Sequence, residues 1–226
     1  MTELLYLFDD STECTASVLS CLPTDDGLYA VTLDRTVFHP QGGGQPSDIG
    51  TINNVSVVKV VHTHEAVLHI TDREVAGEVV LKVNSEKRHL HSRLHSAGHI
   101  VGLVGDQLGW HATRGNHFPG EARVIFEPHV PASVELVDCV QFQAQVNQII
   151  TQAFVRVLNE NNGIRTVTWG DLPAYPCGGT HVKTLNEIGQ VEIKNIKSNK
   201  GQITVSYALI GKYCSHEPNV YLFVFV

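Results

Sequence analysis

The sequence has no hydrophobic run that approaches the ~20 residues required for a membrane-spanning helix. Residues 1–7 are acidic, and they lack the basic region and the apolar stretch of a secretory signal peptide. Cysteine is scarce: five cysteines, an odd number, occur without a C-x-x-C spacing, which argues against a disulfide framework. These absences predict a cytoplasmic protein with reduced thiols and no membrane association.

Positive charge is also in short supply. The 16 Lys and Arg residues are outnumbered by 23 Asp and Glu residues, which gives a net charge of -7. The composition therefore gives no indication of a basic tail for binding polyanions, and any contact with nucleic acid would have to use local basic groups. Each such group could equally be an ordinary solvated surface. The candidates are Lys82, Lys87, Arg88 and Arg93 in the middle of the chain and Lys194, Lys197 and Lys200 near its end.

What the sequence does contain is enough apolar residues for a sizeable core. The chain has 226 residues, of which 42% are hydrophobic, so one large domain or two small ones are possible. Short runs rich in Val, Leu and Ile, separated by turn residues, fill its first third. They predict strands at residues 14–21, 27–34, 55–62, 66–71 and 78–83. We therefore predict a small antiparallel β-barrel or sandwich as a domain over residues 1–84.

A glycine-rich segment lies within this β domain, where Gly42, Gly43 and Gly44 are followed by Gln45. Local sequence favours a hairpin connection that needs positive φ angles. The alternative is a loop that brings backbone N–H groups close to a ligand, with Gln41 and Gln45 as further hydrogen-bonding groups. No G-K-[ST] follows the glycines, so the phosphate loop of nucleotide hydrolases is excluded.

A long helix is predicted over residues 86–108 with Ser85 as its N-cap, because apolar residues recur at alternating spacings of three and four. His95 and His99 lie one helical turn apart on one face, so two imidazoles could bind the same metal ion. His91 lies a further turn back, where it could contact and support a metal ligand, although a surface histidine is the expected interpretation.

The rest of the chain predicts an α+β domain over residues 85–226. We expect a second helix within residues 133–161, a strand at 164–169, and a hairpin of strands at 189–197 and 202–209. Prolines and glycines make residues 171–181 a loop, on which Cys177 and His181 are candidate metal ligands. With His95 and His99 they supply three imidazoles and one thiolate, a donor set that suits tetrahedral zinc.

Several motifs in order resemble those of one family. They are D-R-T-V-F-H-P-Q-G-G-G-Q-P-S-D-I-G at residues 34–50, H-S-A-G-H at 95–99, C-G-G-T-H-V at 177–182 and E-I-G at 187–189. Together they resemble the AlaX family, free-standing relatives of the editing domain of alanyl-tRNA synthetase, and in particular its medium-length members. His39 departs from the pattern, since many members have tyrosine there.

The resemblance implies a trans-editing hydrolase that cleaves the ester between serine or glycine and alanine tRNA. It implies zinc at His95, His99, Cys177 and His181, and a substrate-binding loop of Gly42, Gly43, Gly44 and Gln45. We further hypothesise that Thr36 and Gln45 are catalytic residues that shape the pocket. Four protein ligands are typical of structural zinc, so one ligand could be loose, the zinc could become five-coordinate, or the metal could only organise the pocket.

Two other functions stay open at this point. A non-catalytic zinc and tRNA-binding module of the translation apparatus would use the same fold and ligands. A zinc hydrolase for small esters or amides is a weaker alternative, and a metalloprotease is disfavoured because H-E-x-x-H is absent. Hydrolysis of charged tRNA would separate the first two functions.

Overall fold

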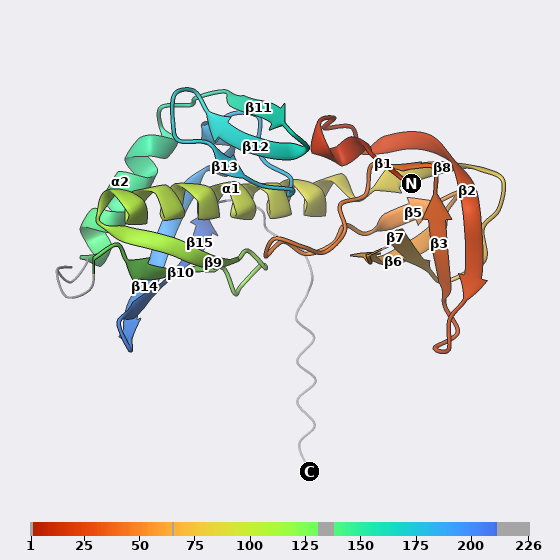
Figure 1. Cartoon of the computed structure of the whole chain (residues 1–226), viewed down its shortest axis with the longest axis horizontal. Helices are drawn as coiled ribbons and strands as arrows, with labels where there is room; N and C mark the ends of the chain where they lie inside the picture. The colour runs from red at the N-terminus through yellow and green to blue at the C-terminus, as the bar shows by residue number, and fades with distance from the viewer. Residues whose placement is uncertain (1, 65, 131–137, 212–226) are drawn as a thin grey trace, which may run out of the picture.

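The computed structural model describes residues 2–64, 66–130 and 138–211, and in this part of the chain the first third forms a closed β-barrel (Figure 1). Its strands are β2 (Glu13–Pro23), β3 (Tyr29–Leu33), β5 (Gly50–Ile52), β6 (Val55–His62), β7 (Val67–Thr71) and β8 (Glu78–Val83), in the order β2-β3-β7-β6-β5-β8. Buried residues alternate with half-buried ones along β7 and with exposed ones along β8, as expected for strands with one face toward a barrel interior. The barrel fills its interior with Val, Leu and Ile side chains. Outside it, β1 (Glu3–Leu4) pairs in parallel with β4 (Arg35–Thr36).

The second half of the described chain surrounds the helix α1 (Ser85–Gln107), which runs across the molecule away from the barrel (Figure 1). A four-stranded antiparallel sheet has the order β14-β15-β10-β9, and a three-stranded sheet has the order β11-β12-β13. These strands are β9 (Trp110–Asn116), β10 (Arg123–Pro128), β11 (Arg156–Asn161), β12 (Ile164–Trp169), β13 (Tyr175–Pro176), β14 (Gln190–Asn199) and β15 (Gln202–Ile210). The helix α2 (Cys139–Ile150) packs against β14 and α1. The predicted α+β class is therefore confirmed.

Burial of α1 on almost every side makes it the centre of this half. Its N-cap is Asn84, one residue earlier than the predicted Ser85. The side chain of Asn84 accepts a hydrogen bond from the backbone N–H of Lys87. Glycines let neighbouring strands approach the helix closely: a Cβ at Gly105 would lie 2.8 Å from Cζ of Phe126. In the described part of the chain, the buried hydrophobic residues form two clusters, one inside the barrel and one around α1. The domain boundary between residues 84 and 85 stays a prediction, and the predicted end at residue 226 lies outside the described residues.

The predicted second helix was too long at its C-terminal end, while its start at residue 133 lies outside the described residues. The helix ends at Ile150, and Val157 belongs to β11 instead. Asn162 and Gly163 do not end a helix: they form the two-residue turn between β11 and β12, with φ angles of 52° and 76°. Asn-Gly is a strong hairpin signal because both central residues of this turn need positive φ.

Three residues of α1 that were expected at the surface are buried. The imidazole of His91 is buried, so the prediction of a surface histidine was wrong. Arg93 donates to the backbone carbonyl of Ile188, and Arg88 forms a buried ion pair with Asp48. Neither arginine is available to a nucleic acid, since both guanidinium groups hold elements of the fold together.

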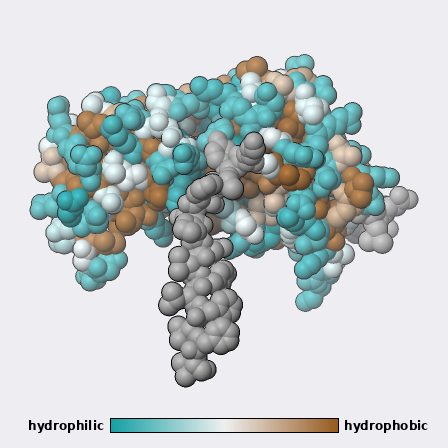
Figure 2. Space-filling view, turned by 180° about the vertical axis from the view of Figure 1, so that it is seen from behind, coloured by the Kyte–Doolittle hydropathy of each residue, from teal (hydrophilic) through white to brown (hydrophobic). Residues whose placement is uncertain are grey.

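The face of the molecule opposite the view of Figure 1 carries both hydrophobic and hydrophilic side chains (Figure 2). Hydrophobic side chains occur there in groups interrupted by hydrophilic ones (Figure 2). Among residues 2–64, 66–130 and 138–211, no helix is long and apolar enough to cross a membrane.

Candidate metal centre and adjoining cavity

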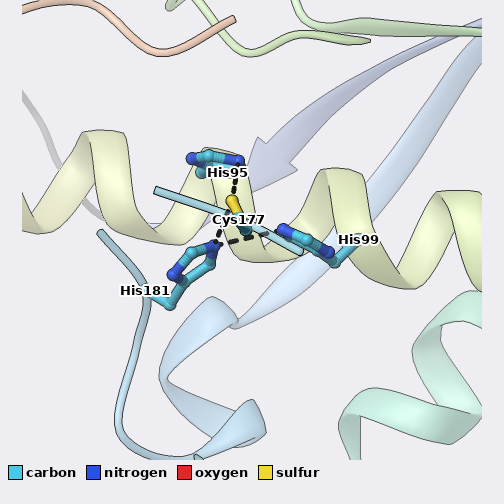
Figure 3. Close-up of side chains that lie close together, drawn as sticks. All are labelled: His95, His99, Cys177 and His181. Atoms are coloured by element: carbon cyan, nitrogen blue, oxygen red, sulfur yellow. Dashed lines mark hydrogen bonds between the residues drawn. The ribbon is translucent and has the colours of Figure 1, made fainter. Parts of the chain in front are cut away.

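Four side chains from α1 and from the loop after β13 converge on one point (Figure 3). His95 and His99 project from consecutive turns of α1, and Cys177 and His181 come from the loop that faces them. Their donor atoms all lie within 4.8 Å of one another. The structure therefore brings together all four predicted ligands, although His95 and Cys177 are 82 residues apart.

The spacing of these donor atoms fits a tetrahedral metal ion. The thiol sulfur of Cys177 lies 3.4 Å from Nε2 of His95 and 3.5 Å from Nε2 of His181, which in turn lies 3.1 Å from Nε2 of His99. Zinc bond lengths in a tetrahedron require about 3.3 Å between two nitrogens and about 3.6 Å between nitrogen and sulfur. The residues present fit such an ion, because these three separations match and all the donor atoms lie within 4.8 Å of one another.

Gln45 orients the first of these ligands. It is fully buried, and its side-chain Oε1 lies 2.7 Å from Nδ1 of His95 and accepts the backbone N–H of Thr180 at 3.0 Å. Because Oε1 can only accept, Nδ1 of His95 carries the proton and Nε2 presents its lone pair to the cluster. The Nε2 of Gln45 donates to Oγ1 of Thr180. With both ends of its amide bonded inside the protein, Gln45 is a positioning residue for His95.

The glycine-rich segment forms the turn that its local sequence favours, and its role in binding a substrate stays a prediction. Gly42 and Gln45 exchange backbone hydrogen bonds, and the two residues between them, Gly43 and Gly44, have φ angles of 56° and 75°. This is a tight turn of the type that needs glycine. The same turn reaches the cluster, since a Cβ at Gly43 would lie 4.0 Å from Cε1 of His95.

Burial sets the protonation of the cluster. It lowers the pKa of His99 to about 4 and holds the pKa values of His95 and His181 well below the ordinary value of 6.5. The three imidazoles are therefore neutral at pH 7, as metal ligands must be. Burial raises the pKa of the Cys177 thiol, so metal binding there would release a proton.

A cavity of about 380 Å³ adjoins the cluster, and three of the four ligands, His95, His99 and Cys177, line it. Gly98 and Gly102 form part of its wall along α1. The absence of side chains at these two positions leaves the space open next to the imidazoles. A ligand in this cavity would therefore lie against the candidate metal centre.

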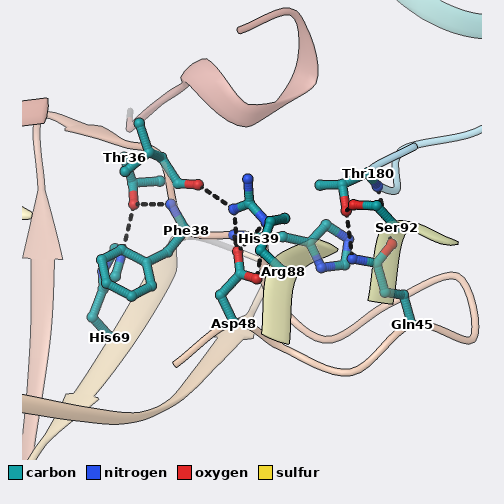
Figure 4. Close-up of polar contacts among 10 residues, drawn as sticks. Thr36, Phe38, His39, Gln45, Asp48, His69, Arg88, Ser92 and Thr180 are labelled. Carbon is teal, nitrogen blue, oxygen red and sulfur yellow. Dashed lines mark hydrogen bonds and ion pairs between the residues drawn. The ribbon is translucent and has the colours of Figure 1, made fainter. Parts of the chain in front are cut away.

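Thr36 is not brought to this site. Its hydroxyl lies 2.7 Å from Nε2 of His69 and accepts the backbone N–H of Phe38 at 3.0 Å, and the side chain is fully buried. Thr36 and Gln45 lie on opposite sides of the pair formed by Asp48 and Arg88 (Figure 4). A catalytic role of Thr36 stays a prediction, and its hydroxyl contacts His69 of the barrel strand β7 and the backbone of Phe38.

His117 adjoins the cluster but was not found from the sequence. Its ring stacks on that of His95, with centroids 4.5 Å apart and an interplanar angle of 19°. Burial, and then the nearby His99, lower the pKa of His117 to about 3, so it too is neutral. The sequence carried no signal for it, because a lone histidine after a strand has no partner at metal-ligand spacing.

Comparison with known proteins agrees with the motifs. Residues 164–204 match the family described as "Threonyl and Alanyl tRNA synthetase second additional domain". The alanyl-tRNA editing protein AlaX-M of Pyrococcus horikoshii is 29% identical over 180 residues, which cover 72% of this chain and 78% of the relative. The chain is a homologue of the AlaX-type editing proteins.

The AlaX-type likeness extends to longer proteins. The alanyl-tRNA editing protein Aarsd1 of Rattus norvegicus is 29% identical over 222 residues, covering 83% of this chain and 53% of the relative. An alanine–tRNA ligase of Haloquadratum walsbyi is 29% identical over 221 residues, covering 85% of this chain and 24% of the ligase. The chain thus spans about half of the rat relative and about a quarter of the ligase.

Proposed function

We propose that this protein is an aminoacyl-tRNA deacylase that hydrolyses the ester between a wrong amino acid, serine or glycine, and alanine tRNA. The observation that carries the proposal is the cavity of about 380 Å³ against which His95, His99 and Cys177 lie. Its volume falls within the range of ordinary ligand pockets. The names of the relatives, alanyl-tRNA editing proteins, support the same activity.

The reaction suits a site of this kind. A synthetase for alanine discriminates poorly against serine and glycine, because an added hydroxyl or a missing methyl changes binding by only ~1 to 3 kcal/mol. A second, hydrolytic site then removes the wrong products. Since an aminoacyl ester is already activated, the site mainly has to hold the acyl end and a water molecule in place.

We propose zinc as the metal, held by His95, His99, Cys177 and His181. When bound, zinc would supply a Lewis acid that polarises an oxygen or orients a substrate group. The protein's own contribution is orientation: Gln45 holds the ring of His95, and the turn at Gly43 and Gly44 brings the barrel against the cavity.

The tRNA end would contact the mouth of the cavity. Arg114 is exposed and lines the cavity, so it is positioned to meet a phosphate of the acceptor end. With a net charge of -7, such contacts are local and few. We therefore expect weak tRNA binding with a shallow dependence on salt.

The direct test is hydrolysis of seryl, glycyl and alanyl esters of alanine tRNA by the zinc-loaded protein. A variant with both His95→Ala and His99→Ala serves as the control. We expect rapid cleavage of the seryl or glycyl ester, slow cleavage of the alanyl ester and no cleavage by the control. Cleavage by a variant without metal would exclude a role for the cluster.

The competing function is a non-catalytic zinc and tRNA-binding module. The four converging protein ligands favour it, because structural zinc sites are usually four-coordinate. Zinc and tRNA binding without hydrolysis of any of the three esters would decide for this function.

A further inference from the structure

The imidazole of His117 has one nitrogen bonded inside the protein and the other directed to the cavity. Nδ1 lies 2.7 Å from the hydroxyl of Tyr207, and that hydroxyl donates to the backbone carbonyl of Leu94 at 2.9 Å. Nε2 has no hydrogen-bond partner among the described residues. His117 lines the cavity of about 380 Å³ together with three of the candidate metal ligands.

These contacts determine the tautomer. A tyrosine hydroxyl has a single hydrogen, and a carbonyl oxygen can only accept, so the hydrogen of Tyr207 goes to Leu94. The short contact with His117 then requires that Nδ1 carries a proton and donates it to the tyrosine oxygen. Nε2 of the neutral ring is consequently a hydrogen-bond acceptor.

The ring is held in place by its surroundings. A Cβ at Gly98 would lie 2.8 Å from the hydroxyl of Tyr207 and still closer to the ring of His117, so only glycine leaves room for this arrangement. On the other side, a Cβ at Gly115 would lie 2.6 Å from Nε2 and would cover it. The backbone N–H of His117 donates to the carbonyl of Gly44, which ties the ring to the glycine-rich turn. Two glycines thus keep a fixed acceptor open to the cavity.

We propose that Nε2 of His117 accepts a hydrogen bond from the hydroxyl of a seryl group, and that His117 is a specificity-determining residue. This inference rests on the proposed function. Among the serine, glycine and alanine side chains, only serine carries a hydrogen-bond donor. An acceptor beside the cluster distinguishes a seryl from an alanyl group because the alanyl group leaves it unpaired. The α-amino group is the competing donor, but all three esters carry it.

The test measures binding rather than turnover. The probes are adenosines that carry a seryl, glycyl or alanyl group on a 3′-amide, which the protein cannot cleave as an ester. We expect the wild-type protein to bind the seryl probe about 10- to 100-fold more tightly than the alanyl probe in calorimetric titrations. His117→Phe replaces the imidazole with an aromatic ring that has no nitrogen, and it should lower affinity for the seryl probe more than for the other two and so abolish this preference. His62→Phe, at an exposed histidine, is the matched control and should behave as the wild type.

Several results would overturn the proposal. Equal loss of affinity for all three probes in His117→Phe would show that the residue contacts a group common to them. An unchanged preference, or no binding of the probes by the wild type, would exclude the role. Nitrogen-15 spectra of the wild-type imidazoles give a check that needs no variant: a proton on Nε2 of His117 would contradict the tautomer. Failure of ester hydrolysis alone would reject the deacylase function and leave these binding results to decide the inference.

Discussion

At Gly179, the addition of a single methyl group should be enough to damage the metal centre. Gly179 lies between Cys177 and His181, and a Cβ there would lie 2.9 Å from Oε1 of Gln45 and nearer still to the ring of His95. Carbon atoms in contact are ordinarily ~3.5 to 4.0 Å apart. Gly179→Ala must therefore separate the loop that carries Cys177 from the ring of His95. The separation would range from several tenths of an ångström to more than one ångström.

The displacement acts on ligands from both sides of the cluster. Cys177 and His181 move with the loop, while His95 is held by its hydrogen bond to Gln45. Loss of the groups that orient metal ligands typically costs 10- to 100-fold in metal affinity, and we expect a loss of about this size for Gly179→Ala. The overall fold should persist, since the cores of the barrel and of the α1 region do not include the loop glycines.

The assay is competition for zinc with a chromophoric chelator, followed by zinc content after dialysis. Gly178→Ala is the matched control, because a Cβ at Gly178 meets nothing within 4 Å and its φ angle is not positive. Zinc affinity of Gly179→Ala equal to that of the wild type would refute the reasoning. Equal damage by both substitutions would also refute it, since it would mean that any side chain in the loop is harmful.

Three further results are expected. Gln45→Leu removes the acceptor for the ring of His95 and should lower zinc affinity by about 10- to 100-fold in the same competition assay. Arg88→Met leaves the buried carboxylate of Asp48 without its cation, and it should lower the free energy of unfolding in urea by about 3 to 5 kcal/mol. The third result concerns pH. Burial lowers the pKa values of His39 and His69 from 6.5 to about 4. Between pH 6.5 and pH 4 the unfolded state therefore binds more protons than the folded state. The metal-free protein should consequently lose stability as the pH falls through this range.

Each of these results has its own control. Gln41→Leu changes an exposed residue of the same segment and should leave zinc affinity unaltered. Adding Asp48→Asn to Arg88→Met removes the stranded charge, and the double variant should recover part of the lost stability. For the pH dependence, His69→Gln should flatten the decline between pH 6.5 and pH 4. A free energy of unfolding that does not change over this range in the wild type would show that the buried histidines are not responsible.

The elements that the sequence predicted well are those with strong local patterns. Short apolar runs between turn residues located β6 and β8, and the apolar stripe located α1 to within one or two residues. The three-residue strand β5 was missed, since so short a segment has no detectable period. Residues 161–163 were interpreted as a helix end because Asn and Gly favour both helix ends and hairpin turns. Only the pairing of β11 with β12 distinguishes the two structures.

The sequence by itself determined which residues could bind a metal. A spacing of four on a helix places two imidazoles on one face, and prolines with glycines confine Cys177 and His181 to a loop, so the ligand pairs follow from local geometry. Only the tertiary structure decided what surrounds them. Burial of Gln45 and stacking of His117 against His95 depend on contacts between segments far apart in the chain, and no local pattern encodes such contacts. Thr36 belongs to the same sequence motif as Gln45, but it lies beside His69 and away from the metal ligands. A strand and a tight turn carry residues that are neighbours in the sequence in different directions.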